Sequence, residues 1–152
     1  AQNLAEAAKQ IAQELAKARA AQQQAAAASA ALAALAKIIE AEQALELETV
    51  KATAQNAPAR FAALAASQGS IQKDATAFKD SLDASMPEAA QSVGQAAAAM
   101  ADSRSQLAGA KGEPARAAEQ RSIDKLLAAQ QSLGTMLQQA QEALGQYYYQ
   151  EW

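Results

Sequence analysis

The sequence of 152 residues contains no histidine and no cysteine. The first absence removes the side chain most often used to transfer protons and bind metals near neutral pH, and the second removes the thiol nucleophile. The serines that remain have no histidine to activate them. Because cysteine is absent, disulfides give no information about the redox compartment. We therefore predict a protein that is not an enzyme and that has no cofactor and no metal.

Glycine, proline and aromatic residues are also scarce, with six glycines, three prolines and 4% aromatics. Alanine is the most frequent residue, and it is the best helix former because it loses no side-chain entropy in a helix. No stretch alternates apolar and polar residues over the length of a strand. The composition predicts an all-α fold, an antiparallel four-helix bundle or coiled coil. Its core should be thin, because alanine buries little area.

No cluster of positive charge stands out among the 13 basic and 16 acidic residues, and the net charge is −3. Nucleic-acid binding needs a basic face that displaces counterions, so we predict no nucleic-acid partner. No run reaches about 18 consecutive apolar residues, so we predict no direct membrane span. Glycine-rich phosphate-binding loops are absent as well.

The few helix breakers fix the expected element boundaries. Residues 1–57 contain neither glycine nor proline, which predicts one unusually long first helix, with a break near Gln22–Gln24 as the alternative. Proline and glycine then mark three turns. The expected later helices are 58–84, 85–108 with Ser85 as its N-cap, and 113–144 with Gly145 as its terminator.

Apolar residues recur at alternating spacings of three and four in every expected helix, which is typical of knobs-into-holes packing. Two glutamines on these seams, Gln68 and Gln130, are interpreted as register-setting polar residues, with a ligand-contacting pocket as the alternative. Shifting the second helix by 62 positions aligns its seam with that of the fourth, which indicates either a duplicated hairpin or a coincidence of two heptads. The seams are Leu35, Ile38, Leu45, Thr49, Ala52; Phe61, Leu64, Gln68, Ile71, Ala75, Phe78, Leu82; Met86, Ala90, Val93, Ala97, Met100, Arg104, Leu107; and Ile123, Leu126, Gln130, Leu133, Leu137, Ala140, Leu144.

A charged residue on a seam is costly unless it is paired. Counting outward from the turn near residue 111 places Arg104 opposite Glu119. We therefore predict an ion pair between them, with solvent exposure of the arginine at the end of the bundle as the alternative.

Residues 1–30 of the long helix reach beyond the ends of the shorter helices and have no packing partner in the bundle. They nevertheless carry an apolar stripe. The predicted organisation is a projecting helical arm at 1–30, a bundle at 31–145 and an aromatic tail at 146–152. The stripe should be buried against a second copy, a neighbouring domain or the tail. The candidate interaction residues are Leu4, Ile11, Leu15, Tyr147, Tyr148, Tyr149 and Trp152.

Four glutamates, Glu40, Glu42, Glu46 and Glu48, gather on the first helix. A di-metal site in a helical bundle would combine glutamates with Glu-x-x-His motifs, and the chain has no histidine. We interpret these carboxylates as a solvated acidic face.

Several segments between residues 39 and 144 carry a resemblance to a group of known sequences. They are Ile39–Gln43 (IEAEQ), Arg60–Gln68 (RFAALAASQ), Pro87–Ala90 (PEAA), Met100–Leu107 (MADSRSQL) and Leu126–Leu133 (LLAAQQSL). They resemble the Ala/Gln/Glu-rich helical segments of large, mostly uncharacterised bacterial envelope proteins that are often tethered by membrane helices. The resemblance implies a scaffold or interaction role outside the cytoplasm and supplies no catalytic residues.

The sequence thus favours a non-enzymatic helical-bundle scaffold or protein-protein interaction domain, which binds a protein partner or itself through the N-terminal helix. A periplasmic or other extracytoplasmic location is favoured. The alternative is an extracytoplasmic four-helix sensor domain that binds a small ligand between its helices. A third class is an amphipathic surface-binding protein of the granule-coating, phasin-like type.

Overall fold

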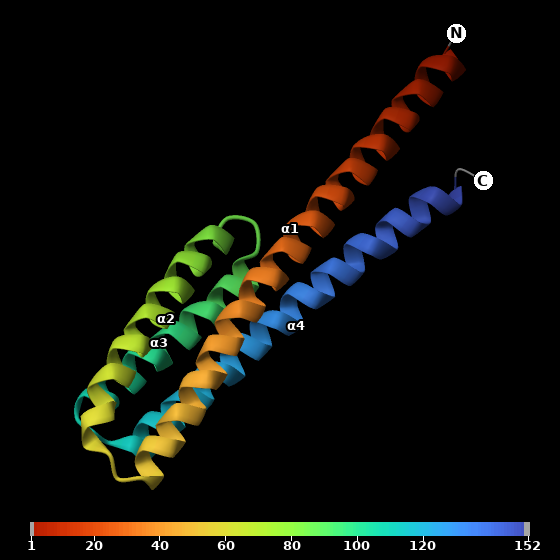
Figure 1. Cartoon of the computed structure of the whole chain (residues 1–152). Helices are drawn as coiled ribbons and strands as arrows, with labels where there is room; N and C mark the ends of the chain where they lie inside the picture. The colour runs from red at the N-terminus through yellow and green to blue at the C-terminus, as the bar shows by residue number, and fades with distance from the viewer. Residues whose placement is uncertain (1, 151–152) are drawn as a thin grey trace. The chain divides into compact units, whose positions relative to one another are not determined.

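The computed structural model describes the backbone of residues 2–150 and the side chains of residues 3–147. The chain is all-α, and its four helices pack antiparallel, which confirms the predicted fold class. The elements are α1 (Gln2–Ala54), the 3-10 turn η1 (Pro58–Arg60), α2 (Phe61–Leu82), α3 (Pro87–Ala108) and α4 (Gly112–Gln150) (Figure 1).

Helix α1 is a single uninterrupted helix of 53 residues, so the alternative of a break near Gln22–Gln24 is wrong. It ends at Ala54, and Asn56 follows with a positive φ of 48°. The N–H of Ala57 donates to the carbonyl of Ala52 at 3.1 Å, and the N–H of Asn56 donates to Thr53 at 3.2 Å. These two bonds form a Schellman motif, which satisfies the last carbonyls of the helix.

The turn between α3 and α4 uses the same motif with a less suitable residue. Ala110 has a φ of 55°, the N–H of Lys111 donates to Gln106 at 2.8 Å, and the N–H of Ala110 donates to Leu107 at 2.9 Å. An L residue with a Cβ is strained in this left-handed conformation, whereas glycine is not. The glycine beside it, Gly109, has an ordinary negative φ of −86°.

We expect Ala110→Gly to stabilise the protein by about 1 kcal/mol, because it removes the strain at the left-handed position. The control is Ala101→Gly, at an exposed position inside α3, where glycine should cost about 1 kcal/mol. Urea unfolding monitored by circular dichroism measures both effects. Equal destabilisation by the two variants would contradict the assigned turn.

Two expected helix-end signals differ from the structure. Gly145 does not end α4, which continues to Gln150; one glycine costs only about 1 kcal/mol in a helix, and good helix formers flank it. Ser85 is not the N-cap of α3, because Met86 occupies that position without a side-chain cap, and its carbonyl accepts the N–H of Ala90 at 2.9 Å.

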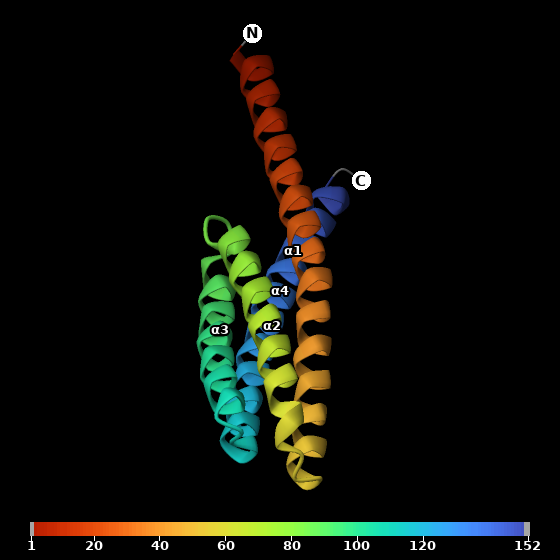
Figure 2. The ribbon, with the colours of Figure 1, turned by 60° about the vertical axis from the view of Figure 1, so that its left-hand side comes forward.

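The chain divides into two compact units. The bundle unit is Ala33–Ser132, and the paired-helix unit combines Ala1–Leu32 with Leu133–Trp152. The predicted boundaries after residues 30 and 145 stay a prediction. Within the bundle unit α2 and α3 lie side by side (Figures 1 and 2).

The turns between α1 and α2 and between α3 and α4 enclose one apolar cluster of the bundle unit. Phe61 and Leu64 of α2 pack there with α1 and with the ends of α3 and α4. The buried members are Leu45, Ala52, Phe61, Leu64, Leu107 and Ala115. The predicted seams are buried or half-buried throughout the bundle unit except at Arg104 and Gln130, which are exposed.

Among the described helices, α1 is long and apolar enough to cross a membrane by length and composition. It contains an 18-residue window with a mean hydropathy of 1.3, of which 28% is buried within the protein. A helix of a soluble core meets the same criterion. The predicted absence of a membrane span therefore stays a prediction.

Candidate functional site

The predicted apolar stripe of α1 lies in the paired-helix unit, and its N-terminal part is uncovered. Leu4 is 78% exposed and Ile11 is 66% exposed, whereas Leu15 is 38% exposed. Farther along α1 the alanines at 18, 21, 28 and 31 are buried. The spacing of Leu4, Ala8, Ile11, Leu15 and Ala18 is the alternation of four and three found in helix-helix seams. The stripe therefore continues a packing seam into solvent.

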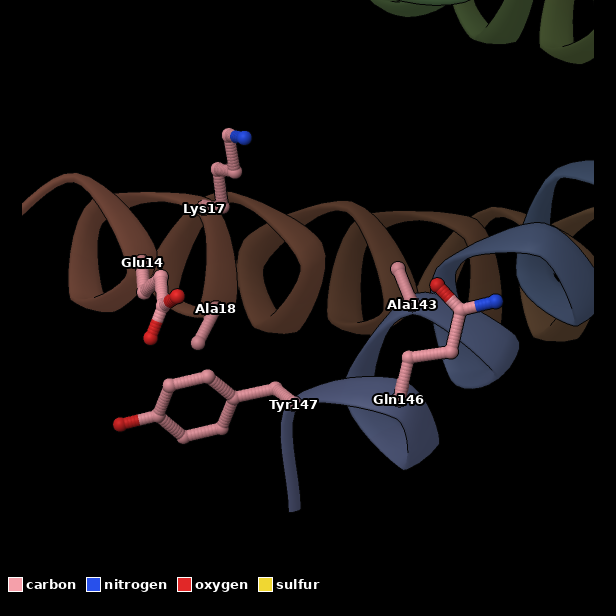
Figure 3. Close-up of a pocket in the computed structure, with 6 residues that line it drawn as sticks. All are labelled: Glu14, Lys17, Ala18, Ala143, Gln146 and Tyr147. Carbon is pink, nitrogen blue, oxygen red and sulfur yellow. The ribbon is translucent and has the colours of Figure 1, made fainter. Parts of the chain in front are cut away.

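Tyr147 is the aromatic residue of the tail whose side chain the structure describes, and it lies beside the start of the buried seam. With Ala143 and Gln146 of α4 it lines a surface pocket of about 350 Å³. The α1 side of this pocket is formed by Glu14, Lys17 and Ala18. Figure 3 shows the Tyr147 ring extending from α4 towards Ala18 and Glu14, while Lys17 points away from it. The tail thus meets α1 near Ala18, and Leu4 and Ile11 stay exposed.

The other predicted aromatic contacts cannot be placed in this pocket. The side chains of Tyr148 and Tyr149, and Trp152 as a whole, lie outside the described residues.

A second feature, in the bundle unit, was not predicted from the sequence. Among the side chains of residues 3–147, six polar ones are completely buried in the core, and every helix contributes at least one of them. We call them the buried polar cluster: Glu42 and Thr49 of α1, Gln68 of α2, Ser103 of α3, and Glu119 and Ser122 of α4.

Two carboxyl groups organise this cluster. Gln68 Nε2 donates to Glu42 Oε1 at 2.7 Å, and Ser122 Oγ is hydrogen-bonded to Glu42 Oε2. Thr49 Oγ1 lies 2.9 Å and Ser103 Oγ lies 3.0 Å from Glu119 Oε2. Two buried acceptor oxygens, Gln68 Oε1 and Glu119 Oε1, have no hydrogen-bond partner. The carboxyl groups thus cross-link all four helices.

Burial dominates the electrostatics of both carboxyl groups, because a low dielectric disfavours their charged forms. It raises the pKa of Glu119 from its ordinary value of 4.5 to about 7; the hydrogen bonds to Thr49 and Ser103 oppose this shift, and the nearby Glu42 and Glu46 add to it. Burial also raises the pKa of Glu42, against the hydrogen bonds to Ser122 and Gln68 and with a further contribution from Glu46.

The predicted ion pair between Arg104 and Glu119 is wrong. Glu119 is buried and bonded to hydroxyl groups, whereas Arg104 is exposed. The Arg104 guanidinium covers Gly69 of α2 instead, where an added Cβ would lie 3.3 Å from its Nε. Ser103 takes the inward position, so Arg104 keeps its charge in water and lays its stem along the neighbouring helix.

The interpretation of the four glutamates needs correction at one position. Glu42 is completely buried, although Glu40 is exposed and Glu46 and Glu48 are half-buried. The signal was present, because position 42 falls on the seam between Ile38 and Leu45. The prediction that Gln130 lies on the packed seam is wrong, because Gln130 is exposed and Ala129 beside it is buried.

Within the described part of the chain, no group of three or more acidic residues is arranged to hold a metal ion. Searches of protein-family models, curated proteins and solved structures found no match to this chain.

Proposed function

We propose that this chain is a non-enzymatic scaffold and protein interaction domain that associates through the N-terminal stripe of α1. The observation that carries the proposal is the exposure of Leu4 and Ile11, at 78% and 66%, on a helix that buries alanines from Ala18 onward. An apolar seam that continues into water is a common mark of an interaction site. Membership of a bacterial envelope protein is proposed from the sequence resemblance.

The partner that fits this stripe best is a second copy of the same segment. When two copies cross antiparallel about a twofold axis, Leu4 comes opposite Leu15 and Ala8 comes opposite Ile11. The two inner layers then pair alanine with isoleucine, and the two outer layers pair leucine with leucine. Self-complementarity of this kind is what an interface between identical surfaces requires.

We expect the wild-type chain to form dimers whose fraction rises with concentration in light scattering. The double variant Leu4→Gln/Ile11→Gln should weaken dimerisation at least about 100-fold, because burying each such side chain contributes about 1.5–3 kcal/mol. Circular dichroism should be unchanged, since both side chains are exposed in the monomer.

The matched control is Leu47→Gln/Leu127→Gln, which removes two exposed leucines of the bundle unit, 55% and 42% exposed. This variant should dimerise like the wild type. A wild-type chain that remains monomeric at every concentration would refute self-association through the stripe. The alternative of a small-ligand sensor domain stays a prediction.

A further inference from the structure

The three hydroxyl groups of the buried polar cluster make five hydrogen-bond contacts, but they have only three protons to donate. Thr49 Oγ1 reaches both the Leu45 carbonyl, at 3.0 Å, and Glu119 Oε2. Ser122 Oγ reaches both the Glu119 carbonyl, at 2.8 Å, and Glu42 Oε2. A carbonyl can only accept, and a hydroxyl has one proton to donate. If Thr49 and Ser122 donate to the backbone carbonyls, their contacts with the two carboxyl groups need a proton from another source.

The two glutamates supply that proton if they are carboxylic acids. Glu42 then donates to Ser122 Oγ and Glu119 donates to Thr49 Oγ1, while the Ser103 hydroxyl donates to Glu119. Each of the five hydroxyl contacts receives one proton in this arrangement. The unpartnered Glu119 Oε1 also becomes a neutral carbonyl oxygen, which is much less costly to bury than half of an ionised carboxylate.

No cation compensates these groups inside the cluster. The facing residues from α2 and α3 are Gln68 and Ser103, which are uncharged. On α1, Glu46 faces both carboxyl groups and adds negative charge. The buried Nε of Arg116 of α4 lies 4.0 Å from Glu46 Oε1 and has no hydrogen-bond partner, while Arg121 pairs with Asp102 at 2.6 Å on the surface. Two ionised carboxylates here would be buried without a counter-ion.

We propose that the buried polar cluster is a proton-linked stability switch, in which Glu42 and Glu119 each hold a proton in the folded bundle unit and the loss of these protons loosens its packing. Both glutamates bridge helices, so ionisation acts on all four elements at once. Repulsion between the carboxylates and their demand for water then favour opening of the core.

The direction of the pH dependence follows from linkage. In the unfolded chain these glutamates lose their protons near pH 4.5, their ordinary pKa. In the folded chain the pKa of Glu119 is about 7, so Glu119 keeps its proton to a higher pH. Between these values the folded state binds more protons, so stability falls as pH rises. For Glu119 alone the folding equilibrium constant should drop about 300-fold across this window, and Glu42, whose pKa is also raised, adds to the drop.

The test is urea unfolding of the full chain at a series of pH values from 4.5 to 8.5. The wild type should become less stable as pH rises, and the variants Glu42→Gln and Glu119→Gln should each remove part of this slope. Glutamine is a neutral match for the protonated acid, so both variants should equal or exceed the wild type at pH 8.5. The control Glu40→Gln removes an exposed carboxylate of the same helix and should keep the wild-type slope.

A measurement on the wild type alone keeps the proposal testable if a variant does not fold. NMR titration of ¹³C-labelled glutamate side chains should show two carboxyl groups with midpoints well above 4.5. Titration of every glutamate near 4.5, or a wild-type slope retained in both variants, would overturn the proposal. So would recovery of stability at pH 8.5 on addition of Mg²⁺ or Na⁺ at constant ionic strength, since a metal cation would then be the natural occupant.

Discussion

The variant Leu126→Asp should lose the cooperative unfolding transition of the bundle unit. Leu126 of α4 is completely buried, and replacing it both removes apolar contacts and places a charge in the core. The first effect costs about 2–5 kcal/mol for a buried leucine, and the unpaired charge adds to it. The sum approaches the whole stability of a domain of this size, about 5–15 kcal/mol. Thermal unfolding followed by circular dichroism measures it.

The neighbouring position provides the control. Leu127 is 42% exposed, so Leu127→Asp should change the melting midpoint only slightly. Because both variants introduce the same charge into the same turn of α4, helix propensity and net charge cancel in the comparison. A melting midpoint of Leu126→Asp equal to that of Leu127→Asp would show that the assigned core face of α4 is wrong.

Among the glycine-to-alanine substitutions, Gly112→Ala should destabilise the folded protein most. Gly112 begins α4 and is buried against Thr53 of α1. An added Cβ would overlap Thr53 Oγ1 and lie 3.0 Å from Thr53 Cβ and 3.1 Å from Cγ2. Rotation about χ1 of Thr53 moves its oxygen and methyl group but not its Cβ, so α1 and α4 must give by a few tenths of an ångström at this contact. We expect a loss of about 2–3 kcal/mol in urea unfolding.

The same substitution at Gly134 should have the opposite sign. Gly134 lies inside α4, and nothing approaches within 4 Å of an added Cβ, so alanine should stabilise the helix by up to about 1 kcal/mol. The double variant Gly112→Ala/Thr53→Ala should recover part of the loss by removing the oxygen and the methyl group. Destabilisation at Gly112 no larger than at an exposed alanine-to-glycine site would contradict this close approach of α1 and α4.

The buried polar cluster sets a condition for these measurements. One pKa unit corresponds to about 1.4 kcal/mol. The shift of the Glu119 pKa from 4.5 to about 7 therefore changes the free energy of unfolding by roughly 3 kcal/mol between acidic and alkaline pH. If core variants were compared at different pH values, the effect of the substitution would be mixed with a pH effect of similar size. All comparisons above should therefore be made at a single pH.

The local sequence determined the helices and most of their buried faces. The absence of glycine and proline before Pro58 leaves no point at which α1 can end, and the structure confirms an unbroken helix to Ala54. The alternation of three and four placed Leu64, Val93, Leu126 and Leu133 in the core, and all four are buried. These properties follow from propensity and periodicity, which act over one or two helical turns.

Tertiary structure decided which polar residues enter the core and which groups they meet. Arg104 and Ser103 are adjacent on α3; the structure turns Ser103 inward to Glu119 and leaves Arg104 exposed over Gly69 of α2. Glu42 and Glu119 lie far apart in the sequence and share a cluster only because α1 and α4 pack together. Their hydrogen bonds join residues 70 and 80 positions apart, and helical periodicity carries no information over that range.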